Sequence, residues 1–215
     1  MKIKKISHCC LVIETGGKRI MTDPGMYSVE QQALERNIDI VLITHEHQDH
    51  LHTDSLKQIL KNNPRAQVIS NASVGKLLEQ EGITFTKLSH GDSLMQEGIS
   101  FEGHGHDHAV IYPTIPSVEN TGFLIDGRLF YPGDAFYNPE KPVEILALPV
   151  VAPWMKISEA IEYAKAIKPK KCFPVHDGMI RTDMPPYIAV RAVGNVLLSD
   201  GIEFVSMGEG SVAEF

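Results

Sequence analysis

The sequence predicts an α/β fold in which two β-sheets pack together and helices cover their outer faces. Strand patterns open the chain, alternate with helical patterns up to residue 90, and return as hairpins over 93–131. Helices and strands of a buried type then alternate as far as the last predicted strand. Because both halves of the chain contain strands and helices, two covered sheets within one domain, 1–215, are the simplest arrangement.

Short runs rich in β-branched residues predict the strands of the first half, and apolar residues at helical spacing predict its helices. The segment 38–43 is almost continuously apolar, as in a strand buried on both faces. The expected strands are 2–6, 10–14, 18–21, 38–43, 67–70 and 83–86. The expected helices are 28–36, with Ser28 as its N-cap, 54–61 and 73–80.

The second half begins with hairpins and ends with alternating strands and helices. Asp126-Gly127 supplies a strong hairpin turn between two of the strands. The expected strands are 93–96, 99–103, 122–125, 128–131, 145–148, 172–175 and 202–205. The expected helices are 158–167 and 186–198.

Composition and charge limit the classes of function. With 43 % hydrophobic and 22 % charged residues, the chain has the composition of an ordinary globular protein. At 215 residues it can bury a core without a metal or disulfides, so a metal motif in it favours catalysis over a structural role. The net charge of −7 disfavours nucleic acid as a partner, because such binding depends on Lys and Arg. A small-molecule substrate is expected instead.

The cysteines and the apolar runs indicate a reducing compartment. Three cysteines give no disulfide framework, and the adjacent Cys9 and Cys10 point to opposite faces of an extended segment. The apolar stretch near the start is too short for a secretory signal, and no run approaches the ~20 apolar residues that span a bilayer. We therefore expect a cytoplasmic location and no membrane contact, and we leave a homo-oligomer open.

A dense group of metal-binding side chains follows the predicted strand 38–43. His45, His47, Asp49 and His50 lie within six residues, immediately past the end of that strand. Strand ends of this kind are where binding sites of α/β proteins form. Neutral imidazoles suit zinc, and a carboxylate lowers the cost of holding a dication. His45 and His47 could reach one metal and Asp49 and His50 a second. The competing interpretation, a solvated loop rich in histidine, explains the density less well.

Four donors in one loop cannot enclose two metals, so further ligands are expected after other strands. Three segments qualify because each places a donor just past an apolar strand. They are 103–108, with His104, His106 and His108; 131–134, with Asp134; and 174–177, with His176. Strand alternation alone would put the three histidines of the first segment on one face and does not choose among them.

From Ile6 to Asp177 the sequence resembles the metallo-β-lactamase-fold hydrolases. Their most specific motif, T-H-x-H-x-D-H, is matched in full by 44–50. The segments 131–135 (YPGDA), 148–156 (LPVVAPWMK) and 174–177 (PVHD) are similar to those of small intracellular, lactonase-like members. The resemblance implies a four-layer αββα sandwich with the site on one edge.

The same resemblance assigns the ligands. It implies His45, His47 and His108 for a first metal and Asp49, His50 and His176 for a second. Asp134 would bridge the two metals, and Asp23 corresponds to an early Asp of the family. His108 is preferred to His104 and His106 because the following residues, 109–111, match the nearer subgroup.

Other polar residues receive smaller roles. His8 lies between two strands and is expected to line the site as a catalytic residue beside Asp49, although a structural histidine is an equal alternative. His52 and His90 are expected in exposed loops, and Cys172 in the core. Glu46 and Gln48 should point away from the metals. Trp154 and Met155 either wall a pocket or pack at a helix start. The β-lactam-hydrolysing branch uses a Cys ligand without a counterpart here, which disfavours antibiotic hydrolysis.

The predicted function is hydrolysis of a small ester, lactone or phosphodiester. Two metal ions, with zinc preferred to manganese or iron, would activate a water for attack on a carbonyl carbon or on phosphorus. The alternatives are an iron-loaded redox protein of the same fold, a metal-dependent nuclease, and a metal-free binding module. Substrate choice would rest with the loops 112–121 and 138–143.

Overall fold

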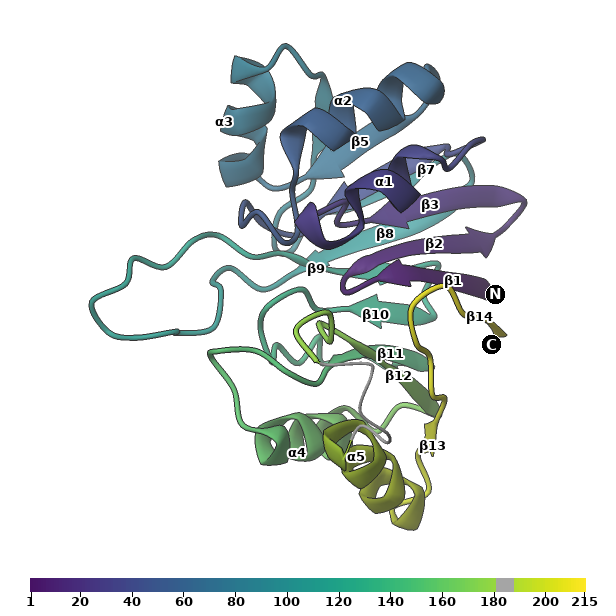
Figure 1. Cartoon of the computed structure of the whole chain (residues 1–215), viewed down its shortest axis with the longest axis vertical. Coiled ribbons are helices and arrows are strands. Elements are labelled where there is room, and N and C mark those ends of the chain that lie inside the picture. Colours follow the sequence, from purple (N-terminus) through teal and green to yellow (C-terminus); the bar gives the residue numbers. More distant parts are fainter. Residues whose placement is uncertain (181–187) are drawn as a thin grey trace.

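The computed structural model describes residues 1–180 and 188–215, and within them the strands form two seven-stranded sheets (Figure 1). The strands of the first sheet, from edge to edge, are β14 (Val212–Glu214), β1 (Lys2–Ser7), β2 (Cys10–Thr15), β3 (Lys18–Thr22), β4 (Ile40–Ile43), β5 (Gln67–Ser70) and β6 (Phe85–Lys87). Those of the second sheet are β13 (Glu203–Phe204), β12 (Lys171–Val175), β11 (Ile145–Pro149), β10 (Leu129–Tyr131), β9 (Gly122–Ile125), β8 (Ile99–His104) and β7 (Ser93–Gln96).

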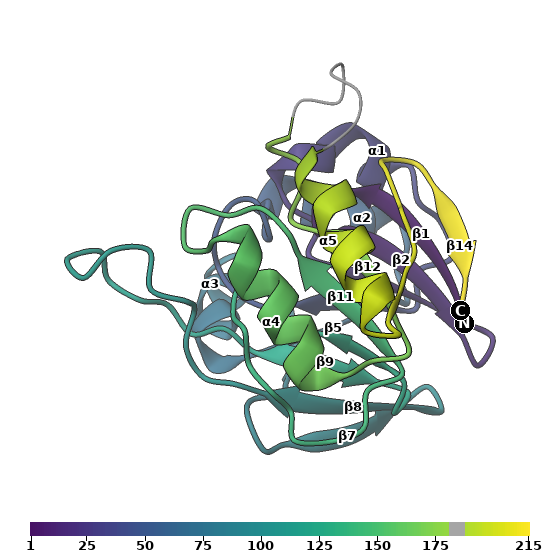
Figure 2. The same cartoon turned by 90° about the horizontal axis from the view of Figure 1, so that it is seen from below.

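The helices cover the two sheets from outside. They are the 3₁₀ turn η1 (Met26–Ser28), α1 (Val29–Ala33), α2 (Thr53–Asn62), α3 (Ala72–Gln80), α4 (Ile157–Ile167) and α5 (Ile188–Ser199). In Figure 1, α1, α2 and α3 lie beyond the first sheet and α4 and α5 beyond the second. Figure 2 shows α4 and α5 side by side across the second sheet. The predicted four-layer αββα sandwich is confirmed.

Strand β2 illustrates why the sequence folds in layers. Leu11 and Ile13 face the core between the sheets, together with Phe101 and Phe123 of the second sheet. The alternate residues, among them Val12, face a second core beneath α2 and α3. Because successive side chains of a strand point to opposite faces, a strand with apolar residues throughout can bury both. A third core lies beneath α4 and α5.

The strand directions bring many chain ends to one edge of the sandwich. β3, β4, β5 and β6 run parallel, and β1 has the same direction because β2 is antiparallel to both β1 and β3. In the second sheet β10, β11, β12 and β13 are parallel to one another, and β8 shares their direction. The segments that follow these strands therefore gather at one end of the two sheets.

Most predicted elements are found within one or two residues of their expected bounds. The helix expected over 28–36 is shorter, because η1 precedes α1 and α1 ends at Ala33, and Asn37 then adopts a positive φ of 59°. The strand expected over 83–86 lies later, as β6. β14 was not expected at all. Residues 186 and 187 of the last predicted helix lie outside the described residues, and α5 is described from Ile188.

Two helices, α2 and α3, begin at side-chain N-caps that the hydrophobic pattern does not reveal. His52 is not the exposed loop residue that we expected: it is the half-buried N-cap of α2, and its Nδ1 accepts a hydrogen bond from the Ser55 backbone N–H at 3.3 Å. Asn71 caps α3 in the same way through Val74.

Among the described residues, no helix has the length and apolar character that crossing a membrane requires.

Candidate metal centre

The loop that follows β4 is folded tightly enough to turn its side chains toward one point. The backbone N–H groups of His50 and Leu51 both bind the carbonyl of His47, at 2.9 and 2.8 Å. Gly25 packs against this loop, and a Cβ there would lie 1.8 Å from the Asp49 carbonyl oxygen. Only glycine fits at this position, so the break after β3 and the ligand loop after β4 are built together.

The first group of ligand atoms joins His45 and His47 of this loop to His108, which lies past the end of β8. One nitrogen from each ring lies within 4.8 Å of the others. The ring centroids are 4.6–5.0 Å apart. His45 and His108 are buried and His47 is half-buried, so this side of the group is open to a ligand.

The second group lies beside the first. The Nε2 atom of His176 is 3.5 Å from Asp49 Oδ2, and that of His50 is 3.8 Å from the same oxygen. His45 also belongs to a close set with Asp49 and His50, whose ligand atoms lie within 4.8 Å of one another. The His45 and His50 rings, 4.0 Å apart, thus connect the two groups.

Asp134 lies between the groups and contacts both. One carboxylate oxygen is 3.1 Å from His50 Nε2, and the other is 3.3 Å from His108 Nε2 and 3.0 Å from His176 Nε2. Burial by itself would raise the pKa of Asp134, but the positive charges available on His50 and His176 hold it well below its usual range. The carboxylate is therefore ionised and shared by the two groups.

The second nitrogen of each buried histidine has a fixed partner. His108 Nδ1 donates to the Ala109 carbonyl and His176 Nδ1 to the Val151 carbonyl, both at 2.6 Å. His50 Nδ1 donates to Asp23 Oδ2 at 2.7 Å. His45 Nδ1 lies 3.0 Å from the Thr44 hydroxyl. Since carbonyls and carboxylates only accept, Nδ1 keeps its proton, and in the neutral rings, which are the form that binds a metal, the Nε2 lone pair faces the centre.

These Nε2 atoms make no hydrogen bond of acceptable geometry among the described residues, although three of them lie 3.0–3.3 Å from an Asp134 oxygen. Those of His45, His50, His108 and His176 are buried without a hydrogen bond, as is Oδ1 of Asp134. Dry, unpartnered acceptors of this kind are costly in a folded protein. A cation at the point where they converge would satisfy all of them, so the donor set fits divalent metal ions.

Asp23 lies behind the ligands and accepts hydrogen bonds from the groups that orient them. Its carboxylate accepts hydrogen bonds from the Thr44 backbone N–H and hydroxyl, both at 2.8 Å, as well as from His50. The Tyr131 hydroxyl lies 2.7 Å from the same carboxylate. Because the Thr44 hydroxyl donates to Asp23, its oxygen is free to accept from His45. One buried carboxylate therefore orients two histidines.

His8 is placed at the same edge by the turn between β1 and β2, where it adopts a positive φ of 48°. Its Nδ1 accepts a hydrogen bond from the Gly178 N–H at 3.0 Å, so in the neutral ring Nε2 carries the proton. That nitrogen lies 3.4 Å from Asp49 Oδ2. Sequence reasoning placed His8 at the site, and the geometry makes it a hydrogen-bond donor to Asp49.

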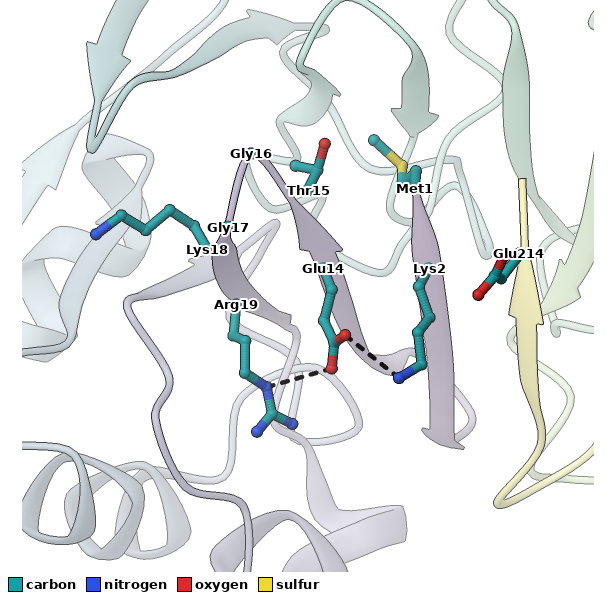
Figure 3. Close-up of a pocket in the computed structure, with 9 residues that line it drawn as sticks. All are labelled: Met1, Lys2, Glu14, Thr15, Gly16, Gly17, Lys18, Arg19 and Glu214. Carbon is teal, nitrogen blue, oxygen red and sulfur yellow. Dashed lines mark ion pairs between the residues drawn. The ribbon is translucent and has the colours of Figure 1, made fainter.

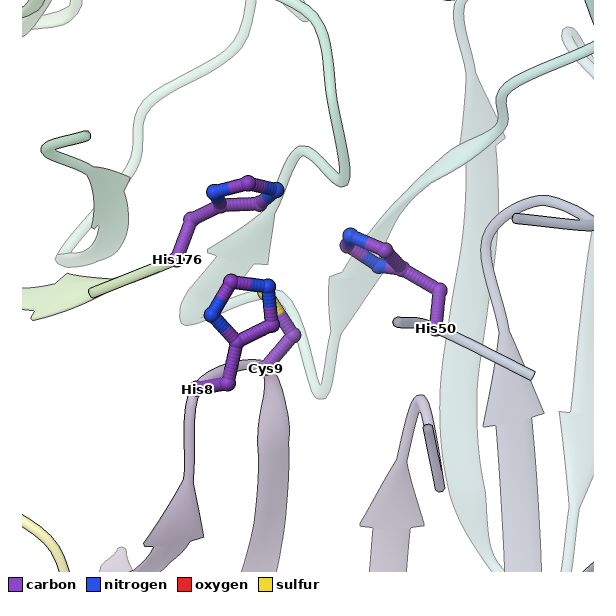
Figure 4. A group of neighbouring side chains, drawn as sticks. All are labelled: His8, Cys9, His50 and His176. Atoms are coloured by element: carbon purple, nitrogen blue, oxygen red, sulfur yellow. The ribbon is translucent and has the colours of Figure 1, made fainter. Parts of the chain in front are cut away.

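Cys9 was missed as a member of this region. Its thiol, with ligand nitrogens of His8, His50 and His176, forms a set of atoms within 4.8 Å of one another (Figure 4). Burial would raise the pKa of the Cys9 thiol, but the neighbouring imidazoles outweigh burial and lower it to about 6. Sequence offered one signal only, the residue's place next to His8 in a strand-ending turn.

The structure separates His108 from the other two histidines of its segment. His106 is exposed and stacks on His90, with ring centroids 4.2 Å apart. His104 ends β8 and lies 3.5 Å from Glu102. Neither joins the groups of ligand atoms. His90 is half-buried rather than exposed, and its Nδ1 accepts from the Gly105 N–H.

The structure also places five other residues for which the sequence suggested a role. Glu46 points away, as expected, and accepts from the Ser73 hydroxyl near the start of α3. Gln48 is exposed. Trp154 belongs to the site, because its Nε1 donates to Asp134 Oδ2 at 2.9 Å. Met155 instead packs against the core beneath α4 and α5, and Cys172 lies within that core.

A cavity of about 450 Å³ opens beside the first group of ligand atoms. His47 and His108 form its floor, and the loop 109–118 forms its walls with mainly apolar side chains. This loop projects from the body of the molecule on the side of β9 (Figure 1). Among the residues that the structure describes, no Lys or Arg lines the cavity.

A larger cavity, of about 580 Å³, lies at the other end of β2 from His8, around the Gly16-Gly17 turn (Figure 3). There Glu14 pairs with Lys2 at 3.4 Å and with Arg19 at 3.6 Å. These side chains are partly exposed and already paired, so they give no reason to expect chemistry at this end of the molecule.

Comparisons with known proteins identify the family of this chain. The profile of the beta-lactamase superfamily domain matches residues 2–176. The chain belongs to this superfamily. Protein Rv0786c of Mycobacterium tuberculosis is 35 % identical over 188 residues, which cover 85 % of this chain and 87 % of that protein. A UPF0173 metal-dependent hydrolase of Thermoplasma acidophilum is 27 % identical over 220 residues, covering 94 % of this chain and 96 % of its own length.

Two solved structures share the fold. A metallo hydrolase from Ignicoccus hospitalis superposes with a TM-score of 0.77 at 22 % identity, covering 100 % of this chain and 98 % of that one. A diiron beta-hydroxylase from Streptomyces venezuelae gives a TM-score of 0.79 at 14 % identity, covering 100 % of this chain and 54 % of that one. Identities this low establish the fold alone, and the chemistry has to be argued from the site.

Proposed function

We propose that this chain is a hydrolase that depends on two divalent metal ions. Seven side chains at the sheet edge would hold them: His45, His47, Asp49, His50, His108, Asp134 and His176. The observation that carries the proposal is the set of four buried histidine Nε2 atoms without a partner among the described residues, all beside an ionised Asp134. The name of the Thermoplasma relative, a metal-dependent hydrolase, supports the same function.

The ligands divide between two positions. His45, His47 and His108 are arranged for the first ion, and Asp49, His50 and His176 for the second. Asp134 contacts His50, His108 and His176 and is therefore suited to bridge. Imidazole and carboxylate donors favour zinc, and they also accept iron or manganese.

Bound at these positions, two metal ions would activate a water and neutralise the charge that develops on the substrate oxygen. The chain's own groups provide the positioning. The Asp49 side chain is 27 % exposed, and His8 holds its carboxylate through a donated hydrogen bond. Trp154 donates a hydrogen bond to one oxygen of Asp134 and so fixes its orientation. Asp49 and His8 are the residues that we assign to catalysis.

The cavity beside His47 and His108 narrows the substrate to a small ester or lactone with an apolar group. Val110, Ile111 and Tyr112 are among its lining residues, and the absence of Lys and Arg from the described part of the lining disfavours a phosphodiester. Phosphate groups are normally met by such cations, whereas an acyl chain needs only apolar contact.

An iron-loaded redox protein is the second candidate. The likeness to a diiron beta-hydroxylase favours it, because that protein carries iron and part of it has the same fold. Elemental analysis, the optical spectrum and oxygen consumption of the purified protein separate the two. Stoichiometric zinc and no oxygen uptake support the hydrolase, while iron with substrate-dependent oxygen uptake supports the redox protein.

The decisive experiment is a screen of metal-loaded protein against lactones, esters, thioesters and phosphodiesters. We expect hydrolysis of a lactone or ester that is lost after dialysis against a chelator and restored by zinc. His45→Ala should be inactive. His106→Ala is the matched control, because His106 lies in the same segment as His108 but is exposed and outside the centre. Activity that survives chelation, or survives in His45→Ala, contradicts the proposal.

A further inference from the structure

The turn between β1 and β2 places a thiol beneath the second ion position. Cys9 is 2 % exposed, and its Sγ lies with the ligand nitrogens of His50 and His176 in a set whose atoms are all within 4.8 Å of one another. Figure 4 shows the Cys9 side chain behind His8, between His50 and His176. These residues come from three separate segments of the chain, so their meeting is a property of the fold.

The two histidines point independently to a ligand at this place. His50 and His176 are 0 % and 1 % exposed, and the Nε2 atom of each is buried without a hydrogen-bond partner among the described residues. Their Nδ1 atoms are occupied by Asp23 and by the Val151 carbonyl. The free lone pair of each ring is therefore on Nε2, close to Asp49 and Asp134, and the thiol lies beside the same two rings.

His8 does not compete with Cys9 for this position. Its Nδ1 accepts from the Gly178 N–H, so its Nε2 carries a proton in the neutral ring and has no lone pair for a metal. Among the four residues of the set, the donors that remain are Cys9, His50 and His176.

We propose that Cys9 binds the second metal ion as a thiolate, together with His50 and His176. The inference rests on the proposed function, since it assumes a metal at that position. Binding forms the metal–sulfur bond and breaks the S–H bond, and the proton leaves to solvent. The ligand set then contains sulfur as well as nitrogen and oxygen, which favours zinc or cobalt over manganese. The choice of metal that the imidazoles alone leave open is thereby narrowed.

Cys10 provides an internal control. It is also 2 % exposed, but it faces the core beneath α2 with Ile6 and Val12, on the opposite side of β2 from Cys9. Burial strongly raises the pKa of the Cys10 thiol, which keeps that thiol protonated. The remaining cysteine, Cys172, lies in the core beneath α4 and α5.

Cobalt(II) substitution tests the proposal through a signal that does not depend on activity. A thiolate ligand gives cobalt an intense near-ultraviolet charge-transfer band, which imidazole and carboxylate ligands do not. We expect this band in the protein loaded with two cobalt ions, its loss in Cys9→Ala, and its retention in Cys10→Ala. We also expect the preference of the second position for zinc over manganese to fall roughly 10-fold or more in Cys9→Ala.

A second measurement covers the case in which Cys9→Ala does not fold. The double variant Cys10→Ala/Cys172→Ala retains Cys9 as the only cysteine of the chain. X-ray absorption of its zinc form should contain a sulfur contribution at about 2.3 Å. Two bound metals with no charge-transfer band and no sulfur contribution overturn the role of Cys9 and leave the proposed function intact. Failure to bind any metal overturns both, and a band that persists in Cys9→Ala overturns the role of Cys9 alone.

Discussion

Each buried histidine of the metal centre depends on the group that binds its other ring nitrogen. Backbone carbonyls hold His108 and His176, while Asp23 holds His50 directly and His45 through the Thr44 hydroxyl. Such partners fix the tautomer that presents Nε2. Asp23 is therefore a positioning residue, fully buried and without any place in the ligand set.

Asp23→Asn should weaken metal binding without removing a ligand. An amide can accept fewer of the hydrogen bonds that Asp23 now receives from Thr44, His50 and Tyr131. We expect the affinity of the second position to fall about 10- to 100-fold. The free energy of unfolding should fall by about 1–3 kcal/mol, because buried donors lose their acceptor. Competitive metal titration and urea unfolding measure the two effects. Asp107→Asn, at an exposed position of the same charge, should change neither.

Mutation of His108 tests the choice among the three histidines of segment 103–108, which strand alternation alone did not make. His108→Ala should lose about half of the bound metal, because a nitrogen donor of the first group disappears while Asp49, His50 and His176 remain. His106→Ala should retain the full metal content. Elemental analysis after dialysis gives the answer. Equal losses in the two variants, or no loss in His108→Ala, would place the third ligand of the first metal elsewhere.

At the scale of single residues, most of the candidate centre could be predicted from the sequence, because its donors directly follow strands. The density of His45–His50 and the strand-ending Asp134 and His176 needed no tertiary information. Periodicity could not choose among His104, His106 and His108, because the segment leaves the strand at Gly105, with a φ of 89°, and alternation no longer applies. Cys9 could not be predicted as a member of this centre, because its neighbours His50 and His176 come from distant segments of the chain.

At the level of elements, the carboxyl ends of parallel strands and the loops behind them determine the site. Core strands were predictable because their composition is dictated by burial. The exposed edge strand β14 was not, since Val212 is 52 % exposed and only its backbone pairing with β1 makes it a strand. Helix α1 ended early for a similar reason: Leu34, which continues its apolar pattern, is 72 % exposed and has no core to face.

The loop 109–118 should determine which acyl groups are hydrolysed. Val110 and Ile115 line the cavity and are 68 % and 49 % exposed, so substitution there leaves the core intact. In the wild type, kcat/KM along a series of lactones should rise about fourfold for each added methylene, from about 0.8 kcal/mol of apolar burial. In Val110→Ser/Ile115→Ser this dependence should flatten while the shortest substrate is little affected.

Met95→Ser is the control for the loop variant, because Met95 is also 68 % exposed but lies on β7 and does not line the cavity. It should retain the chain-length dependence of the wild type. If the loop variant retains it as well, the apolar group of the substrate binds elsewhere.

For the whole molecule, the four-layer architecture follows from apolar strands that must bury both faces, together with helices that have one apolar side. That much was predictable from the pattern and from the resemblance to the superfamily. The organisation of 1–215 as one domain stays a prediction. What the pattern could not provide is the set of polar contacts that join the two sheets, because these pair residues far apart in the sequence.

Lys5 makes such a contact and is the residue that we expect to matter most for global stability. It lies in β1 and is 1 % exposed, yet its Nζ donates to the Pro174 carbonyl at the end of β12 at 2.8 Å. The same ammonium pairs with Asp177 at 2.7 Å and reaches the Met207 carbonyl at 3.2 Å. One buried cation thus connects the first sheet, the second sheet and the segment that leads to β14.

Lys5→Met should lower the free energy of unfolding by about 3–5 kcal/mol, because two buried carbonyls and the mostly buried Asp177 lose their partner. Lys4→Met is the matched control: Lys4 is the preceding residue of the same strand, its side chain is 41 % exposed, and its pair with Glu35 should contribute about 1 kcal/mol or less. Urea unfolding of both variants, loaded with the same metal, measures the difference. A loss in Lys5→Met no larger than in Lys4→Met would mean that apolar packing alone holds the two sheets together.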